Sequence, residues 1–254
     1  KWPRSSSFKQ PHKWGDYLLN KHEYRKVRIR RALIGVFYVI MVSSKVMADE
    51  FLEKSQFSSI TEARPAWSWG LALYNGQRTP SLYQGIIPDA LNGQLILQDA
   101  HISSFVLSKH LFDIDIQLPF SEYRLNGFSF ETEATINKHS GLQKNSEVSG
   151  ALVIRSGEFS LGANMSMNVS WGHGLSYALA KPSWEYGTSG LRGIDTPQLQ
   201  YFMSHEVEFR HAAAQNISGF VRLHHRSGMY GVFSSGVAGT GSNYIGAGLR
   251  ILFP

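Results

Sequence analysis

The chain has 254 residues, with 25 Lys and Arg against 19 Asp and Glu, a formal net charge of +6 and no cysteine. The positive excess lies at the front, because residues 1–48 hold 11 of the basic residues and 2 of the acidic ones. Residues 49–254 therefore carry 14 basic and 17 acidic residues, a net charge of −3. This balance gives no support for nucleic-acid binding, and the lack of cysteine excludes a disulfide-stapled scaffold.

The front of the chain has the three parts of a secretory signal. Residues 25–31 are mostly basic, residues 32–42 are an apolar run, and Val46 and Ala48 occupy the two selective positions of a cleavage site. This order predicts a signal peptide at residues 25–48 that is cleaved after Ala48. The apolar run is too short for a transmembrane helix, and a short buried helix is the alternative. Residues 1–24 form an N-terminal extension of undecided status, because such signals normally begin a protein.

Beyond the signal, apolar and polar residues alternate in segment after segment. This period of two is typical of strands whose two faces meet different surroundings. Phe128, Phe130 and Ile136 alternate with Glu131 and Glu133 in the clearest segment. No later stretch is long and apolar enough for a spanning helix, so a membrane role would require strands. The eight predicted strands are residues 67–74, 101–112, 127–137, 147–155, 159–169, 199–209, 217–227 and 243–253.

Charged residues recur on the faces opposite the apolar stripes. Eight strands make a small barrel whose interior is filled by side chains, which argues against a solute pore. Because buried charges must be paired, we expect an internal charge network of Glu131, Glu133, Glu206, Glu208, Arg155, Arg222 and Arg250.

The last predicted strand ends on a near-terminal aromatic residue. Its apolar residues alternate from Ile245 through Leu249 to Phe253. This pattern resembles the end of bacterial outer-membrane barrels, in which the barrel assembly machinery reads the terminal strand. We therefore predict an all-β fold, an eight-stranded antiparallel transmembrane β-barrel over residues 49–254, located in the bacterial outer membrane. The alternative is a soluble β-sandwich that carries lipid.

Such a barrel has both termini in the periplasm, which assigns each connection to one side. Residues 156–158 predict a tight periplasmic turn, whereas residues 113–126 are longer and continue the alternation of the second strand. We expect His173 either to bind a lipid headgroup or to belong to an aromatic girdle with Tyr177, Trp184, Tyr186 and Tyr230. The predicted outer connections are residues 75–100, 139–146, 171–197 and 228–242.

The candidate chemistry lies at the outer end of the seventh predicted strand. His225 and Ser227 share its apolar face, about 7 Å apart along the backbone, which is close enough for an imidazole to reach a hydroxyl. A serine activated by a histidine attacks esters, and on this face the substrate would be a lipid reached sideways from the membrane. The alternation points His224 inward, and Arg226, near the loop, is the residue best placed to meet lipid phosphates.

Over residues 216–253 the sequence resembles the PagL-type lipid A deacylases. His225, Ser227 and residues 241–244 carry this resemblance. It implies an eight-stranded outer-membrane barrel acting on lipid A, with His225 as base and Ser227 as nucleophile. That family orients the histidine with a glutamate at the start of the last strand, where this chain has Ser242 or Asn243 and no acidic residue in 228–253.

Two functions therefore remain open. The first is hydrolysis of an acyl ester of lipid A by Ser227, His225 and Asn243, or Ser242 in its place. The missing acid is compatible with a slow hydrolase, a hydrolase with another acid or an inactive relative. The second function is a non-catalytic barrel that anchors, stabilises the membrane or binds a partner through its loops. We expect no cofactor and no metal, because His211, His224 and His225 lack the spacing of metal ligands.

Overall fold

The structure is a computed structural model that describes residues 67–117, 124–162, 164–185, 195–229 and 241–254. The predicted extension at 1–24 and the predicted signal at 25–48 lie outside these residues. Within the described part of the chain, no helix is both long enough and apolar enough to cross a membrane.

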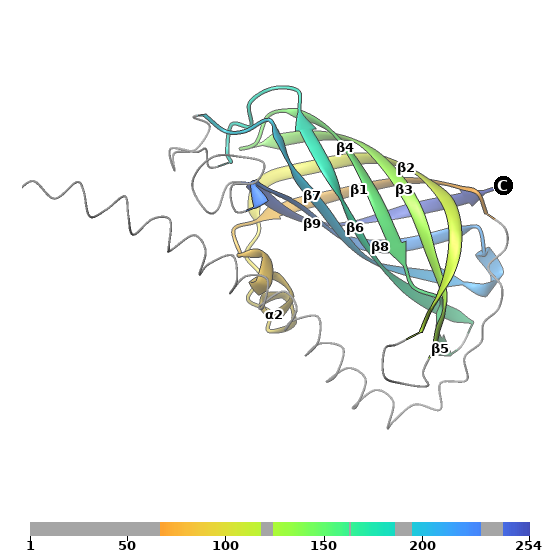
Figure 1. Ribbon diagram of the computed structural model, residues 1–254. Coiled ribbons are helices and arrows are strands. Elements are labelled where there is room, and N and C mark those ends of the chain that lie inside the picture. The colour runs from red at the N-terminus through yellow and green to blue at the C-terminus, as the bar shows by residue number, and fades with distance from the viewer. Residues whose placement is uncertain (1–66, 118–123, 163, 186–194, 230–240) are drawn as a thin grey trace, which may run out of the picture. The chain divides into compact units, whose positions relative to one another are not determined.

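Nine strands and three short helical segments make up the described chain (Figure 1). In chain order they are β1 (Trp69–Thr79), η1 (Tyr83–Gly85), α2 (Ile86–Leu91), β2 (Gln98–Gln117), β3 (Arg124–Gly141), β4 (Ser146–Arg155), β5 (Phe159–Gly162), β6 (Met165–Ala178), β7 (Leu199–His211), η2 (Ala212–Ala214), β8 (Ile217–Ser227) and β9 (Gly241–Phe253).

Eight of these strands close into an antiparallel barrel. The sheet runs in the order β4-β3-β2-β1-β9-β8-β7-β6, and β4 also pairs with β6, which joins its two edges. The short strand β5 pairs with β6 and stays outside the ring. We call the end where β1 begins and β9 ends the proximal end, and the end where β8 finishes and β9 begins the distal end. The predicted eight-stranded antiparallel barrel is confirmed.

The barrel is polar inside and apolar outside. Along β4, for example, Glu147, Ser149 and Arg155 are buried, while Leu152 between them is exposed. This distribution is the reverse of that in soluble barrels and is typical of barrels that cross a membrane. The exposed exterior carries Leu73, Phe105, Leu107, Ile136, Val148, Leu152, Trp171, Leu175, Val207, Phe209, Ile217, Val221, Leu249, Ile251 and Phe253.

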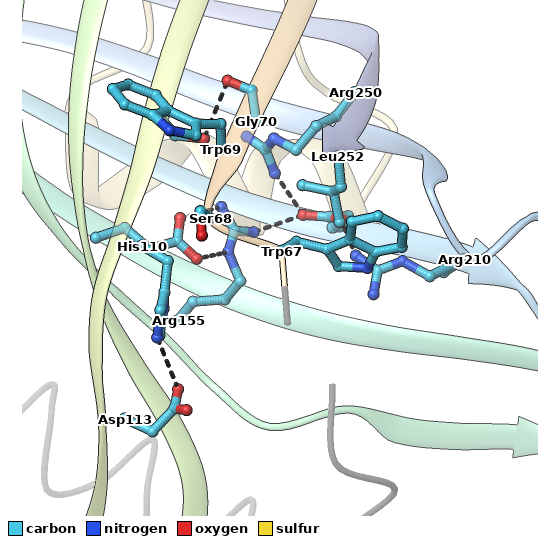
Figure 2. Close-up of a pocket in the computed structure, with 13 residues that line it drawn as sticks. Trp67, Ser68, Trp69, Gly70, His110, Asp113, Arg155, Arg210, Arg250 and Leu252 are labelled. Carbon is cyan, nitrogen blue, oxygen red and sulfur yellow. Dashed lines mark hydrogen bonds and ion pairs between the residues drawn. The ribbon is translucent and has the colours of Figure 1, made fainter. Parts of the chain in front are cut away.

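The interior charges form the expected network. Near the proximal end, Arg155 donates to Glu131 at 2.9 Å and to Glu208 at 2.6 Å, and Arg250 donates to Glu206 at 2.5 Å. A cavity of about 80 Å³ opens beside these groups, and Figure 2 shows the Arg155 and Arg250 guanidinium groups directed at the carboxylates that line it. Each of the seven charged residues predicted for the network has a partner of opposite charge, as buried charges require.

A second polar layer fills the interior toward the distal end. The Nε2–H of His224 donates to Glu147 at 3.1 Å, and its Nδ1 accepts from the Tyr74 hydroxyl at 2.9 Å. Glu147 also accepts from Nε2 of His139 at 2.8 Å. His224 therefore points inward with both ring nitrogens bonded, as its alternation predicted.

The prediction of a single fifth strand over residues 159–169 was wrong. Gly162 and Asn164 have φ of 75° and 66°, so the chain reverses there and divides β5 from β6. The strand that closes the barrel continues to Ala178, through residues that we had assigned to an outer loop. Glycine at this position allows close packing of the two strands, because a Cβ on Gly174 would lie 1.8 Å from the carbonyl oxygen of Gly150.

The other connections differ from the prediction mainly in where strands end. β1 continues to Thr79, and β2 extends to Gln117, as the alternation beyond residue 112 suggested. The predicted tight turn at residues 156–158 is part of a longer link that includes β5. Between β1 and β2 the chain forms η1 and α2, which lie at the distal end, away from the C-terminus (Figure 1).

Candidate active site on the outer wall

His225 and Ser227 lie on the exterior of the barrel, near the distal end of β8. Their neighbours His224 and Arg226 are fully buried in the interior, whereas His225 and Ser227 are half-buried on the outer wall. In the strand register His225 stands between Met203 of β7 and Asn243 of β9. The alternation of the strand therefore places the two predicted residues on one outward face, as expected.

Asn243 is bonded to His225 and fixes its tautomer. The side-chain oxygen Oδ1 of Asn243 contacts Nδ1 of His225. The amide nitrogen Nδ2 of Asn243 donates to the backbone carbonyl of Ser81 at 2.9 Å. Because a carbonyl can only accept, this second bond turns the amide oxygen toward the imidazole. His225 must then carry its proton on Nδ1, which leaves Nε2 unprotonated and able to accept a proton.

Ser242, the alternative partner, is excluded by the strand alternation. Its side chain points into the barrel and its hydroxyl donates to Glu185 at 2.7 Å. Glu185 also accepts from Arg226 at 3.1 Å in this fully buried layer. Asn243, one residue further along β9, is therefore the partner of His225.

No carboxylate among the described residues forms an ion pair with His225. Glu206 and Glu208 point inward into the charge network, as predicted. Glu185 lies on the interior side of the wall. His225 is therefore bonded to a neutral amide, which orients the imidazole but stabilises an imidazolium less than a carboxylate does.

Ser227 is not bonded to His225 in the described structure. Its Oγ accepts a hydrogen bond from the backbone N–H of Met229 at 3.4 Å, close to the upper limit for such a bond. A hydroxyl held this weakly is free to turn toward the imidazole two residues earlier on the same face. Catalytic hydrogen bonds are often long in unliganded sites and tighten only when substrate binds.

Two residues that the sequence analysis missed complete the surroundings of His225. The ring of Tyr83, in η1, packs on His225 with centroids 4.6 Å apart, and its hydroxyl contacts Nε2 of His205. His205 faces outward on β7, in register with Leu223. It could have been found as the polar residue that interrupts the apolar face of the sixth predicted strand. Tyr83 could not, because it reaches the site from a loop.

His173 and Tyr201 form a second polar pair on the same wall. Nδ1 of His173 and the hydroxyl of Tyr201 are 2.8 Å apart, and the two rings stack at 6.0 Å. Tyr201 lies in register with Ser227. Tyr177 is exposed on the exterior of β6, as a girdle residue would be, whereas Tyr186 and Tyr230 lie outside the described residues.

The prediction that Arg226 meets lipid phosphates was wrong. Its side chain is fully buried, and besides Glu185 it binds the carbonyl of Gln198 at 3.0 Å. The reason is the same alternation that turns His225 outward, because adjacent residues of a strand face opposite sides. Over the described residues, no group of three or more His, Cys, Asp or Glu is placed to hold a metal ion.

No protein-family model and no curated protein matches the chain. Among solved structures, the chain is similar to the crystal structure of the outer membrane enzyme PagL, with 17% sequence identity and a TM-score of 0.45. The match covers 72% of this chain and 98% of that one. The closed strand pairing of the chain itself defines the barrel fold.

Proposed function

We propose that the chain is a bacterial outer-membrane barrel that hydrolyses an acyl ester of lipid A. The apolar exterior and the charged interior support a membrane location, because each surface matches the medium it would face. The exposed Phe253 on the last strand supports recognition by the barrel assembly machinery. With the distal end facing outward, His225 and Ser227 lie at the level of the outer leaflet, where lipid A is found.

The hydrogen bond that Nδ1–H of His225 donates to Oδ1 of Asn243 carries this proposal, since it leaves Nε2 of the imidazole as a base. Nε2 accepts the proton of the Ser227 hydroxyl while Oγ attacks the ester carbonyl, which gives a tetrahedral oxyanion. We expect backbone N–H groups after Ser227, near Gly228, to stabilise that oxyanion. The intermediate releases the sugar alcohol, which takes the proton from His225. Water then cleaves the acyl-serine by the same base, and the fatty acid leaves.

The test is mass spectrometry of lipid A after expression of the protein in a bacterial host with an outer membrane. We expect the loss of one acyl chain with the wild type and unchanged lipid A with Ser227→Ala. Heat-modifiable migration in gels is the control, because folded barrels show it and sandwiches do not. Unchanged lipid A from a wild-type protein that is folded in the membrane would rule out the hydrolase.

A non-catalytic barrel is the second candidate, and two observations favour it. The neutral Asn243 stands where a catalytic histidine is usually served by a carboxylate, and Ser227 is not bonded to His225 in the described structure. The barrel would then anchor in the membrane or bind a partner through its distal loops. Unchanged lipid A in the experiment above, together with normal folding, is the result that this candidate predicts.

A further inference from the structure

We infer that Tyr83 is a positioning residue for His225, and that the segment of residues 81–89, which carries Tyr83, lies against the barrel wall at His225. The kinetic part of this inference rests on the proposed hydrolase, whereas its structural part does not. The segment contacts the site at two points, the ring of Tyr83 and the carbonyl of Ser81.

The first contact holds the face of the imidazole. The Tyr83 ring packs on His225 with an interplanar angle of 41°, and on His205 with centroids 5.6 Å apart and an angle of 45°. The hydroxyl of Tyr83 contacts Nε2 of His205 and so ties the ring to β7 as well as to β8. The tyrosine is therefore held against two neighbouring strands, and the plane of the His225 ring is restricted from one side.

The second contact holds the edge of the imidazole through Asn243. Ser81, two residues before Tyr83, accepts from Nδ2 of Asn243 with its carbonyl, and its hydroxyl donates to Asp89 in α2 at 2.6 Å. The backbone N–H of Ser81 donates to Oγ1 of Thr79 at 3.2 Å, where β1 ends. One short, internally bonded segment thus fixes both the amide that bonds Nδ1 and the ring that covers the imidazole face.

The segment has exposed apolar side chains and an uncharged tyrosine, which is compatible with a place beside the apolar wall. Leu82 and Ile87 are 76% and 65% exposed, so the segment continues the apolar exterior of the barrel. Burial raises the pKa of Tyr83 to about 12, so the phenol stays neutral beside His225 and keeps a proton for its bond to His205. A neutral ring restricts the imidazole without changing its charge, which is the property that a positioning residue needs.

Nuclear magnetic resonance of the full chain in detergent micelles, labelled with ¹⁵N-histidine, tests the structural part. The spectrum of His225→Gln assigns the His225 signals. We expect the wild type to show one tautomer, protonated at Nδ1, and Tyr83→Ala to show a mixture of the two tautomers. Tyr83→Phe retains the ring and is expected to leave His225 as in the wild type while it shifts the His205 signals. An unchanged His225 tautomer in a folded Tyr83→Ala protein would overturn the inference.

Kinetics on lipid A micelles test the catalytic part. We expect Tyr83→Ala to lower kcat about tenfold to a hundredfold with little change in KM, because misplacing a catalytic group lowers the rate of the chemical step. Tyr177→Ala, which removes an exposed tyrosine from the same wall, is the matched control and should retain wild-type rates. A rise in KM alone would make Tyr83 a substrate contact and overturn the inference. If the folded wild type cleaves no lipid A, the proposed function fails, and the tautomer experiment alone decides the role of Tyr83.

Discussion

Arg222 of β8 and Glu133 of β3 form a bidentate ion pair across the inside of the barrel. Nη1 and Nη2 of the arginine donate to the two carboxylate oxygens at 2.8 and 2.5 Å, and both side chains are buried. The two strands stand on opposite sides of the ring, four places apart in the sheet order. Arg222 also donates from Nε to Glu206 of β7 at 2.9 Å. The pair therefore links walls that no backbone hydrogen bond connects.

Glu133→Gln is expected to destabilise the barrel by about 3–5 kcal/mol, because it leaves a buried guanidinium without one of its charged partners. Urea titration, followed by the heat-modifiable band in gels, measures the change. The double variant Glu133→Gln with Arg222→Met is the control, since it removes the charge that was left unpaired. It should recover much of the loss. Equal stability of Glu133→Gln and the wild type would show that Glu133 contributes nothing to the free energy of unfolding.

Asn243→Asp should increase the rate of ester hydrolysis. A carboxylate in place of Oδ1 stabilises the imidazolium that forms when His225 takes the serine proton, and we expect a gain of about tenfold or more. The same change removes the donor to the Ser81 carbonyl, so the gain is expected to be smaller than that of a full triad. A time course of lipid A deacylation by mass spectrometry measures it. Asn243→Leu, which keeps neither bond, should reduce the rate, and a rate unaffected by either variant would contradict the role of Asn243.

Two neighbouring glycines at the closing seam of the barrel should differ in their tolerance of alanine. A Cβ on Gly174 would lie 1.8 Å from the carbonyl oxygen of Gly150, whereas a Cβ on Gly150 meets its nearest atom at 3.9 Å. Gly174→Ala must push β4 and β6 apart and is expected to cost about 1–3 kcal/mol or more. Gly150→Ala should stay within about 0.5 kcal/mol of the wild type. The urea concentrations at which the two variants are half unfolded measure this difference. Equal midpoints would contradict the close approach of Gly174 to the carbonyl oxygen of Gly150.

The sequence predicts most of this fold because a strand that faces lipid on one side and charge on the other has a strong period of two. That period located β8 at its observed bounds and turned Glu131, Glu206 and Arg250 inward. The period of two failed to give the correct end of β6. Residues 171–178 were predicted as part of an outer connection, and only the packing of β6 on β4 and β7 explains why Gly172 and Gly174 belong to a strand.

The candidate site was predictable only where it follows the strand period. His225 and Ser227 were placed on one outward face by counting residues along one strand, whereas the choice between Ser242 and Asn243 was left open until the structure showed Ser242 pointing inward. The contact of Tyr83 could not be predicted, because it depends on how the β1–β2 connection packs against β7 and β8, and no spacing in the sequence encodes that. Arg226 was predicted wrongly because the alternation of the strand was not applied to it. Its position next to the outward-facing His225 places its side chain in the interior.

The docking of Tyr83 on the outer wall should weaken in alkali. Its pKa is raised by burial, and further by the nearby Tyr201, from 10 to about 12 when the segment is docked. Below pH 10 both the docked and the undocked tyrosine keep their proton, so docking does not depend on pH. Between about pH 10 and 12 the undocked form loses its proton first, which favours release of the segment as the pH rises.

Tyrosinate absorbance at alkaline pH checks this. In the difference between the wild type and Tyr83→Phe, the other tyrosines cancel, and the remaining step reports on Tyr83. We expect its midpoint near pH 12 in the folded barrel and near pH 10 in urea, where the segment is undocked. A midpoint near pH 10 in the folded protein would mean that Tyr83 is solvated, and the packing on His225 and His205 would then not persist in solution.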